Sequence, residues 1–220
     1  MSRFSNRMLS RLLSRSPRCL IQLGCALIVV VGLGLPTPTA AQSSGAPSAY
    51  YVRMSMGLSD YTGDAGGGLG FADFFDSAKF NEDTFPFMWA GEAGYRLSPL
   101  TSLVLGYQFG QYPFAAGASD RFGTTRHTLQ VLGRQRFGDP TWLVRPYADA
   151  GLNVTVGGDA VGAGPSLGGG LSASVSDRVA IYVESRFHAV FGDAAVDGAA
   201  NGVPFDVLSA LPATGVRIDL

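Results

Sequence analysis

Cysteine is absent from most of this chain, because both of its cysteines, Cys19 and Cys25, fall near the N-terminus. A disulfide framework or a cysteine metal site is therefore excluded for everything that follows. After residues 1–41 the chain also has no run of about 20 apolar residues, which excludes a membrane-spanning helix there. Glycine is abundant, at 30 of 220 residues, but follows no fixed short repeat, so neither collagen nor a solenoid fits.

Acidic residues are missing from residues 1–41, which carry five arginines, then an apolar run, then small residues. This order predicts a secretory signal peptide that is cleaved after Ala41 or, as an alternative, after Ala40. A retained membrane anchor is the competing interpretation, and the small residues after the apolar run disfavour it. We expect residues 42–49 to form a short lead and residues 50–220 to form one domain.

The charge balance changes once the leader is removed. Cleavage takes away five of the 16 basic residues and none of the 17 acidic ones, so the net charge falls from −1 to −6. An exported, acidic chain without a basic patch excludes nucleic acid as a partner.

Apolar and polar residues alternate with a period of two in eight segments after the leader. In residues 178–191, for example, Val179 and Ile181 fall on one face, whereas Glu184 and Arg186 fall on the other. Such alternation predicts two-faced β-strands, and helical periodicity is absent, so the chain is expected to be all-β. In the last segment we expect one apolar face made of Leu208, Ala210, Val216, Ile218 and Leu220.

The links between these segments alternate between long and short. Four long links, including residues 157–165, are separated by three short ones. This alternation predicts an up-and-down barrel whose four loops and three turns face different compartments, with the loops outside the cell and the turns in the periplasm.

The apolar faces have too much area for the narrow interior of an eight-stranded barrel. Strands of about 10 residues match the thickness of a bilayer, and a closed barrel is the only β-structure that satisfies its backbone groups in lipid. We therefore predict an eight-stranded antiparallel up-and-down transmembrane β-barrel with apolar faces outward and charges inward. Aromatic residues near both strand ends agree with this orientation, and a soluble lipocalin-like barrel is the alternative.

Charged residues on the inward faces are the candidate functional residues. Because unpaired buried charges are costly, we predict an ion-pair network that plugs the lumen. The alternative interpretation is a pore whose arginine lining attracts anions. The predicted network consists of Arg53, Glu92, Arg96, Arg134, Arg145, Asp149, Glu184, Arg186 and Arg217.

An enzymatic function is not expected. Glu184, Ser185 and His188 resemble a hydrolytic set in sequence, but alternation places Ser185 on the opposite face from the other two. His127, the other histidine, is expected to face outward; it could meet a serine from another strand, but nothing in the sequence points to one. We expect no catalytic residue, cofactor or metal site.

The first long link has a composition that suggests surface binding. It interleaves acidic residues with phenylalanines, among them Asp73, Phe74, Phe75 and Asp76. One interpretation is a lobe that binds a surface partner or the divalent cations that bridge to lipopolysaccharide. The other is a solubilising acidic loop whose phenylalanines pack on the barrel rim.

The C-terminal residues "GVRIDL" contain Gly215, Ile218 and Leu220, and they resemble the signal that the barrel-assembly machinery recognises in bacterial outer-membrane proteins. That signal usually ends in phenylalanine, so Leu220 departs from it, which bears on the efficiency of assembly. Together with the upstream "YVESRF", the end of the chain is similar to the small OmpA-type or opacity-type barrel domains of the porin family.

The resemblance implies an integral protein of the outer membrane of a Gram-negative cell, in contact with outer-membrane lipid and lipopolysaccharide. The expected role is structural or adhesive, through the loops. A narrow porin or a transporter of small or hydrophobic molecules is the alternative, and a lipid-A-modifying enzyme is a third.

Overall fold

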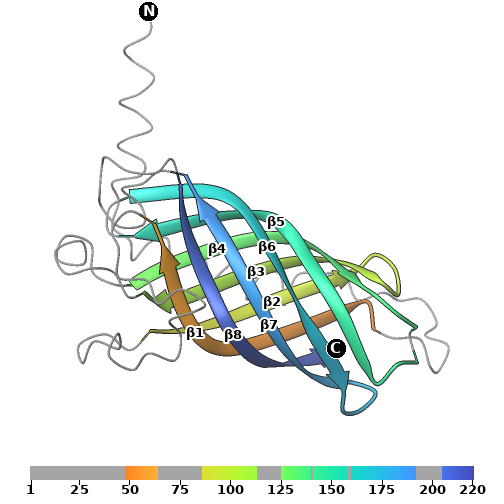
Figure 1. Cartoon of the computed structure of the whole chain (residues 1–220). Coiled ribbons are helices and arrows are strands. Elements are labelled where there is room, and N and C mark those ends of the chain that lie inside the picture. The colour runs from red at the N-terminus through yellow and green to blue at the C-terminus, as the bar shows by residue number, and fades with distance from the viewer. Residues whose placement is uncertain (1–47, 64–85, 113–124, 140, 158–159, 192–204) are drawn as a thin grey trace, which may run out of the picture. The chain divides into compact units, whose positions relative to one another are not determined.

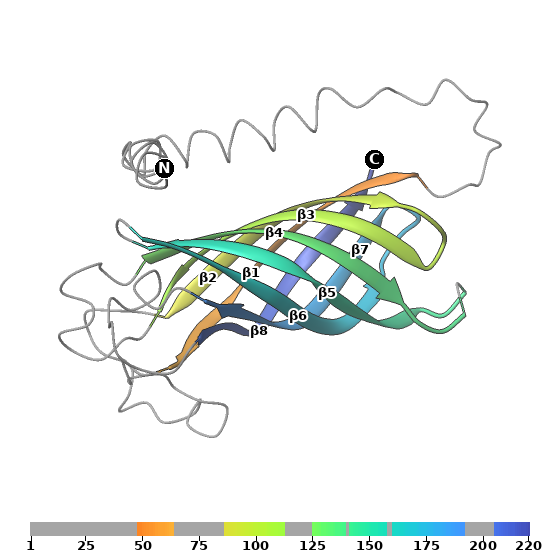
Figure 2. The same ribbon diagram turned by 90° about the horizontal axis from the view of Figure 1, so that it is seen from above.

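The described part of the chain is a closed barrel of eight antiparallel strands (Figures 1 and 2). The computed structural model describes residues 48–63, 86–112, 125–139, 141–157, 160–191 and 205–220. The strands are β1 (Tyr50–Thr62), β2 (Phe87–Arg96), β3 (Thr101–Gln111), β4 (Thr125–Arg136), β5 (Val144–Gly157), β6 (Ala160–Ser174), β7 (Val179–Val190) and β8 (Asp206–Asp219). Each strand pairs with its neighbours in sequence, and β8 closes the barrel on β1, so the predicted topology is confirmed.

Strand β1 illustrates how the sequence pattern becomes an inside and an outside. Met54 and Met56 are 70% and 69% exposed on the outer wall, whereas Arg53 and Ser55 between them are buried in the lumen. The outward-facing positions of the other strands are filled in the same way by large apolar side chains such as Leu152. The prediction that the apolar faces point outward and the charges inward is therefore confirmed. No helix of the described residues is long and apolar enough to cross a membrane.

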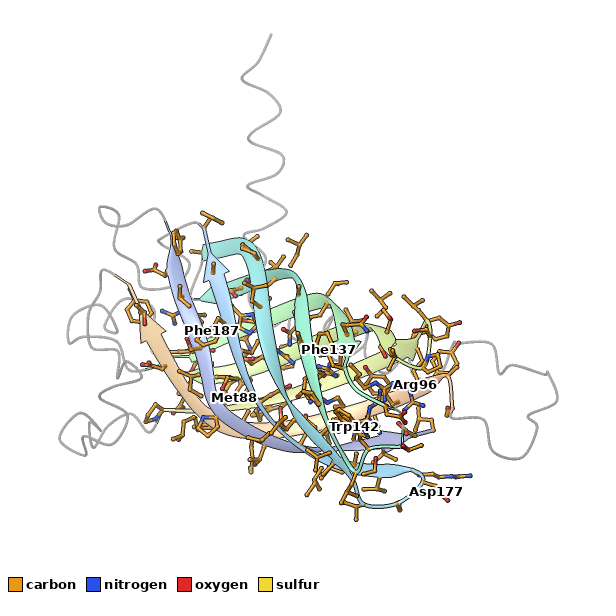
Figure 3. All side chains as sticks on the ribbon, turned by 45° about the vertical axis from the view of Figure 1, so that its right-hand side comes forward. Met88, Arg96, Phe137, Trp142, Asp177 and Phe187 are labelled. Carbon is orange, nitrogen blue, oxygen red and sulfur yellow. The ribbon has the colours of Figure 1, made fainter. Side chains whose placement is uncertain are left out.

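The two ends of the barrel differ in their connections. One end, here named the turn end, carries three short connections, which are residues 97–100, 137–143 and 175–178. The opposite end is named the loop end. Figure 3 shows Arg96, Trp142 and Asp177 toward the turn end.

Exposed aromatic residues occupy both ends, as the sequence predicts. Phe137 and Trp142 are exposed beside the turn end, and Phe191 and Phe205 are exposed beside the loop end. Aromatic side chains at both rims of an apolar wall are typical of transmembrane barrels, because these side chains favour the interfaces of a bilayer.

The prediction of a third long link is wrong. Residues 157–165 are almost entirely strand, because β5 ends at Gly157 and β6 begins at Ala160. Pairing continues without a break from Gly157↔Ala160 through Val156↔Val161 to the far end of the hairpin. Small residues misled the prediction here: glycine and alanine are typical of loops, but in this hairpin they pair as regular strand positions.

The prediction of a single apolar face for the last strand is also wrong, for the first half of that strand. Leu208 and Ala210 point into the lumen, whereas Val216 and Ile218 point outward as predicted. A β-bulge at Leu211 and Pro212 separates the two halves, since these two residues oppose the single residue Leu58 of β1 and the single residue Ser185 of β7. An extra residue in one strand shifts the alternation by one position, so the inward face changes from even to odd residue numbers.

Candidate functional site in the barrel lumen

Six charged side chains meet in the middle of the lumen, and Arg53 of β1 lies between two of the acids. Its Nη1 atom lies 3.0 Å from Oε2 of Glu92, and its Nη2 atom lies 3.0 Å from Oε2 of Glu184. These three residues belong to β1, β2 and β7, so the contacts cross the lumen as well as joining neighbouring strands. All three side chains are almost fully buried.

Two further arginines complete this central network. Arg134 of β4 contacts Asp149 of β5 through two nitrogens, each 2.7 Å from a carboxylate oxygen, and its Nη2 atom lies 3.0 Å from Glu92. Arg186 of β7 contacts all three acids, at 2.6 Å to Glu92, 3.1 Å to Asp149 and 3.1 Å to Glu184. The network therefore balances three arginines with three carboxylates. Such balance is needed because a buried charge without a partner is strongly destabilising.

Two tyrosines fill the remaining directions around Arg53. The hydroxyl group of Tyr147 accepts a hydrogen bond from Arg53 Nη2 at 2.8 Å and donates one to Glu184 at 2.7 Å. The ring of Tyr182 lies 3.5 Å from the guanidinium carbon of Arg53, in cation–π geometry. Sequence reasoning missed both tyrosines as members of the network, although alternation placed them on the inward face.

A second, apolar layer lies nearer the loop end. Tyr61, Tyr112, Val190 and Leu208 form a buried cluster in which no side chain is more than 1% exposed. Below it, toward the central network, Met88 and three alanines form another buried cluster. Buried side chains therefore occupy the lumen on the loop side of the ion pairs.

Three residues predicted to join the network lie elsewhere, nearer the turn end. Arg96 and Arg217 both contact Asp219, with distances of 2.6 and 3.2 Å from their nitrogens to its Oδ1 atom. Arg145 has no carboxylate within ion-pair distance in the described part of the chain, so its expected ion pair is not found there. Asp219 was missed as a site residue, although its spacing of two from Arg217 places both on one face.

The comparisons with known proteins concern the fold. No family model matches the chain, and no curated protein matches its sequence. The crystal structure of Neisserial surface protein A matches with a TM-score of 0.55 at 15% sequence identity, over 80% of this chain and 99% of that one. The chain therefore has the fold of the small eight-stranded outer-membrane β-barrels.

Two other solved barrels match over similar lengths. The N-terminal β-barrel domain of Pseudomonas aeruginosa OprF has a TM-score of 0.43 at 15% identity and covers 80% of this chain and 100% of its own. Ail, the attachment invasion locus protein of Yersinia pestis, has a TM-score of 0.44 at 10% identity and covers 79% and 100%.

The hydrolytic residues considered from the sequence do not form a site. Glu184 and His188 point into the lumen, and Ser185 lies between them on the outer face opposite the bulge. His188 instead contacts Ser166, with 2.8 Å between Nδ1 and Oγ, and its Nε2 atom lies 3.2 Å from the amide oxygen of Gln108. His188 and Ser166 are no more than 1% exposed, so no substrate can reach this serine–histidine pair in the structure.

The other histidine also lacks a catalytic partner. His127 lies on the outer wall and contacts the hydroxyl group of Tyr107, with 2.6 Å between Nδ1 and Oη. The ring of Phe109 packs edge-on against it. Among the described residues, no group of three or more histidines, cysteines or acids is arranged to hold a metal ion.

The C-terminal residues occupy both faces of β8. Ile218 and Leu220 are exposed on the outer wall, whereas Gly215 faces the lumen. A Cβ atom at Gly215 would lie 2.5 Å from the ring of Tyr182, so glycine makes room for the tyrosine that stacks on Arg53. The surface-loop candidates Asp73, Phe74, Phe75 and Asp76 lie outside the described residues, as does the predicted signal peptide.

Proposed function

We propose that this chain is an integral outer-membrane protein without enzymatic activity whose lumen is plugged. In this proposal, residues 1–41 direct export through the general secretory pathway and the barrel-assembly machinery inserts the chain by its C-terminal residues. Its role is structural or adhesive, and the long connections of the loop end meet partners or lipopolysaccharide outside the cell.

The plugged lumen is supported by the central network. Its charged side chains extend from five of the eight strands, and each is almost fully buried. An eight-stranded barrel has an interior just wide enough for its own side chains, so groups that meet at its centre leave no continuous aqueous path.

A narrow porin or transporter is the second candidate function. It is favoured by the arginines of the turn end, which outnumber the carboxylates there and would attract anions into a channel. For ions to pass, the central network would have to open, and that would separate at least one of its buried ion pairs.

Conductance separates the two candidates. The purified barrel is inserted into planar lipid bilayers and its single-channel current is recorded, beside the variant Glu92→Ala, which removes the acid that contacts all three arginines. We expect no stable open level in the unmodified protein. A stable level of hundreds of picosiemens in the unmodified protein would contradict the plug and favour the porin.

Location and orientation are tested separately on cells. We expect a folded band that migrates anomalously on SDS gels until the sample is boiled, and extraction only with detergent. Protease added to intact cells should cut within the connections of the loop end and spare residues 97–100 and 175–178. Extraction without detergent, or cleavage at those turns in intact cells, would refute the proposed location or orientation.

A further inference from the structure

Positive charge is concentrated inside the turn end of the barrel. Arg96, Arg136, Arg145 and Arg217 lie close enough for Arg136 to be repelled by the other three. Among the described acids, only Asp219 lies within ion-pair distance of any of them, and it contacts Arg96 and Arg217. Asp139, on a fully exposed turn, attracts Arg145 from outside ion-pair distance. Unlike the central network, this group is far from charge balance.

A small cavity lies between this group and the central network. It offers about 10 Å³ of space for the centre of a water-sized particle, which is room for about one. Its lining contains four guanidinium groups and three hydroxyl groups and no carboxylate. The lining residues are Tyr51, Arg53, Arg134, Arg136, Tyr147, Ser172 and Arg217.

Several buried donors at this end have no acceptor. Arg136 lines the cavity and is 8% exposed, and no carboxylate of the described residues lies within ion-pair distance of it. The Nε and Nη2 atoms of Arg145 and the Nε atom of Arg96 are buried and have no hydrogen-bond partner in the part of the chain that the structure describes. The hydroxyl group of Tyr51 is likewise buried without a hydrogen-bond partner among the described residues. Buried polar groups normally have partners, so these donors indicate a missing acceptor.

We propose that the turn end of the lumen binds one small oxyanion of the phosphate class. One oxygen of the anion occupies the cavity, where it accepts hydrogen bonds from Arg136, Arg217 and the hydroxyl group of Ser172. The others face Arg96 and Arg145 at the mouth. Arginine suits this ligand because its planar fork donates two parallel hydrogen bonds to a phosphate group. Beyond the cavity the central network closes the path, so the site is a blind pocket.

The same chemistry has two possible sources, which are free inorganic phosphate and the head group of a phospholipid in the adjoining leaflet. The structure favours the free anion, because the guanidinium groups that line the cavity point into the lumen while the lipid lies outside the wall. A head group would have to bend around the rim to reach Arg136.

The test uses the refolded barrel in a sugar-based detergent and phosphate-free buffer, with inorganic phosphate titrated in a calorimeter. The variants are Arg136→Gln and Arg217→Gln. Arg178→Gln is the matched control, because Arg178 is an exposed arginine on a turn at the same end. We expect saturable one-to-one binding by the unmodified protein and by the control, and at least tenfold weaker binding by the other two variants.

Stability provides a second readout that a merely structural arginine would not give. Without phosphate, Arg136→Gln should unfold at a higher denaturant concentration than the unmodified protein, because it removes repulsion among four arginines. Phosphate should then raise the unfolding midpoint of the unmodified protein and leave that of the variant unchanged. If Arg136→Gln does not fold, Arg136→Lys replaces it as the test variant. Lysine keeps the positive charge but lacks the planar guanidinium group, so phosphate binding should still be weaker than in the unmodified protein.

Two results would overturn the proposal. The first is no saturable binding by the unmodified protein, and the second is equal binding by all of the variants. The lipid source is tested in nanodiscs of phosphatidylglycerol, where a bound head group would block titration by inorganic phosphate. Such a block would refute the free anion as the ligand and assign the site to lipid.

Discussion

At the scale of single residues, Glu92 has a special position in the lumen. It receives contacts from Arg53, Arg134 and Arg186, at 3.0, 3.0 and 2.6 Å, whereas Asp149 and Glu184 each contact two arginines. Removing its charge would leave three arginines facing two carboxylates in a buried site. Among the three acids of the network, the cost of an uncompensated buried charge therefore falls most heavily on Glu92.

We expect Glu92→Gln to reduce the free energy of unfolding by about 3–5 kcal/mol, the cost typical of breaking a buried ion pair from one side. The measurement is urea-induced unfolding in lipid vesicles, followed by tryptophan fluorescence. As the control, Arg178→Gln on the exposed turn should change this energy by no more than about 0.5 kcal/mol. Equal effects of both variants would mean that the ion pairs do not stabilise the barrel.

At the scale of one element, the bulge in β8 decides which side chains enter the lumen. Without the extra residue, either Leu208 and Ala210 or Arg217 and Asp219 would have to face lipid. Pro212 suits the bulged position because it has no N–H group to give to a regular ladder. Ser185, the polar residue that interrupts the outer face of β7, lies directly opposite this bulge.

Deletion of Pro212 is expected to abolish the folded barrel, because it forces the two halves of β8 into one continuous alternation. Heat-modifiable migration on SDS gels after refolding measures the folded fraction. Pro212→Ala keeps the length of the strand and should retain most of the folded band. A deletion variant that folds as well as the unmodified protein would show that the bulge does not set the register.

At the scale of the whole molecule, the barrel reverses the usual arrangement of a soluble protein. Its outer wall is apolar, with a hollow of about 900 Å³ that is lined mainly by outward-facing side chains such as Met54, Trp89, Leu171 and Ile181. Its interior holds the charges. Such a wall is stable in the hydrocarbon core of a bilayer, where a closed barrel leaves no backbone group unpaired.

A charged side chain on the outer wall should therefore reduce the free energy of unfolding most when it lies midway between the two ends of the barrel. We expect Met56→Arg, in the middle of β1, to lower the free energy of unfolding in vesicles by about 2–4 kcal/mol. Leu97→Arg is the matched control, because Leu97 is similarly exposed but lies at the turn end, where the expected cost is about 0–1 kcal/mol. Equal costs at the two positions would argue against a bilayer around this wall.

The sequence by itself determined the strand number, the order of the strands and, for most of the chain, the side of the wall on which each residue lies. Period-two alternation carries that information locally, as in Met54 and Met56 beside Arg53 and Ser55. It also gave the inward position of nearly every charged residue in the lumen, because a charge that faces lipid is too costly.

Only the tertiary structure decided which charges meet. Arg186 contacts Glu92 across the lumen, and nothing in either strand specifies that distance, which depends on barrel closure and on the stagger of all eight strands. Closure likewise separated the balanced central network from the arginine-rich turn end. The bulge at Leu211 and Pro212 could not be predicted from period-two alternation either. One extra residue changes the face on which the following side chains lie without changing the composition of the strand.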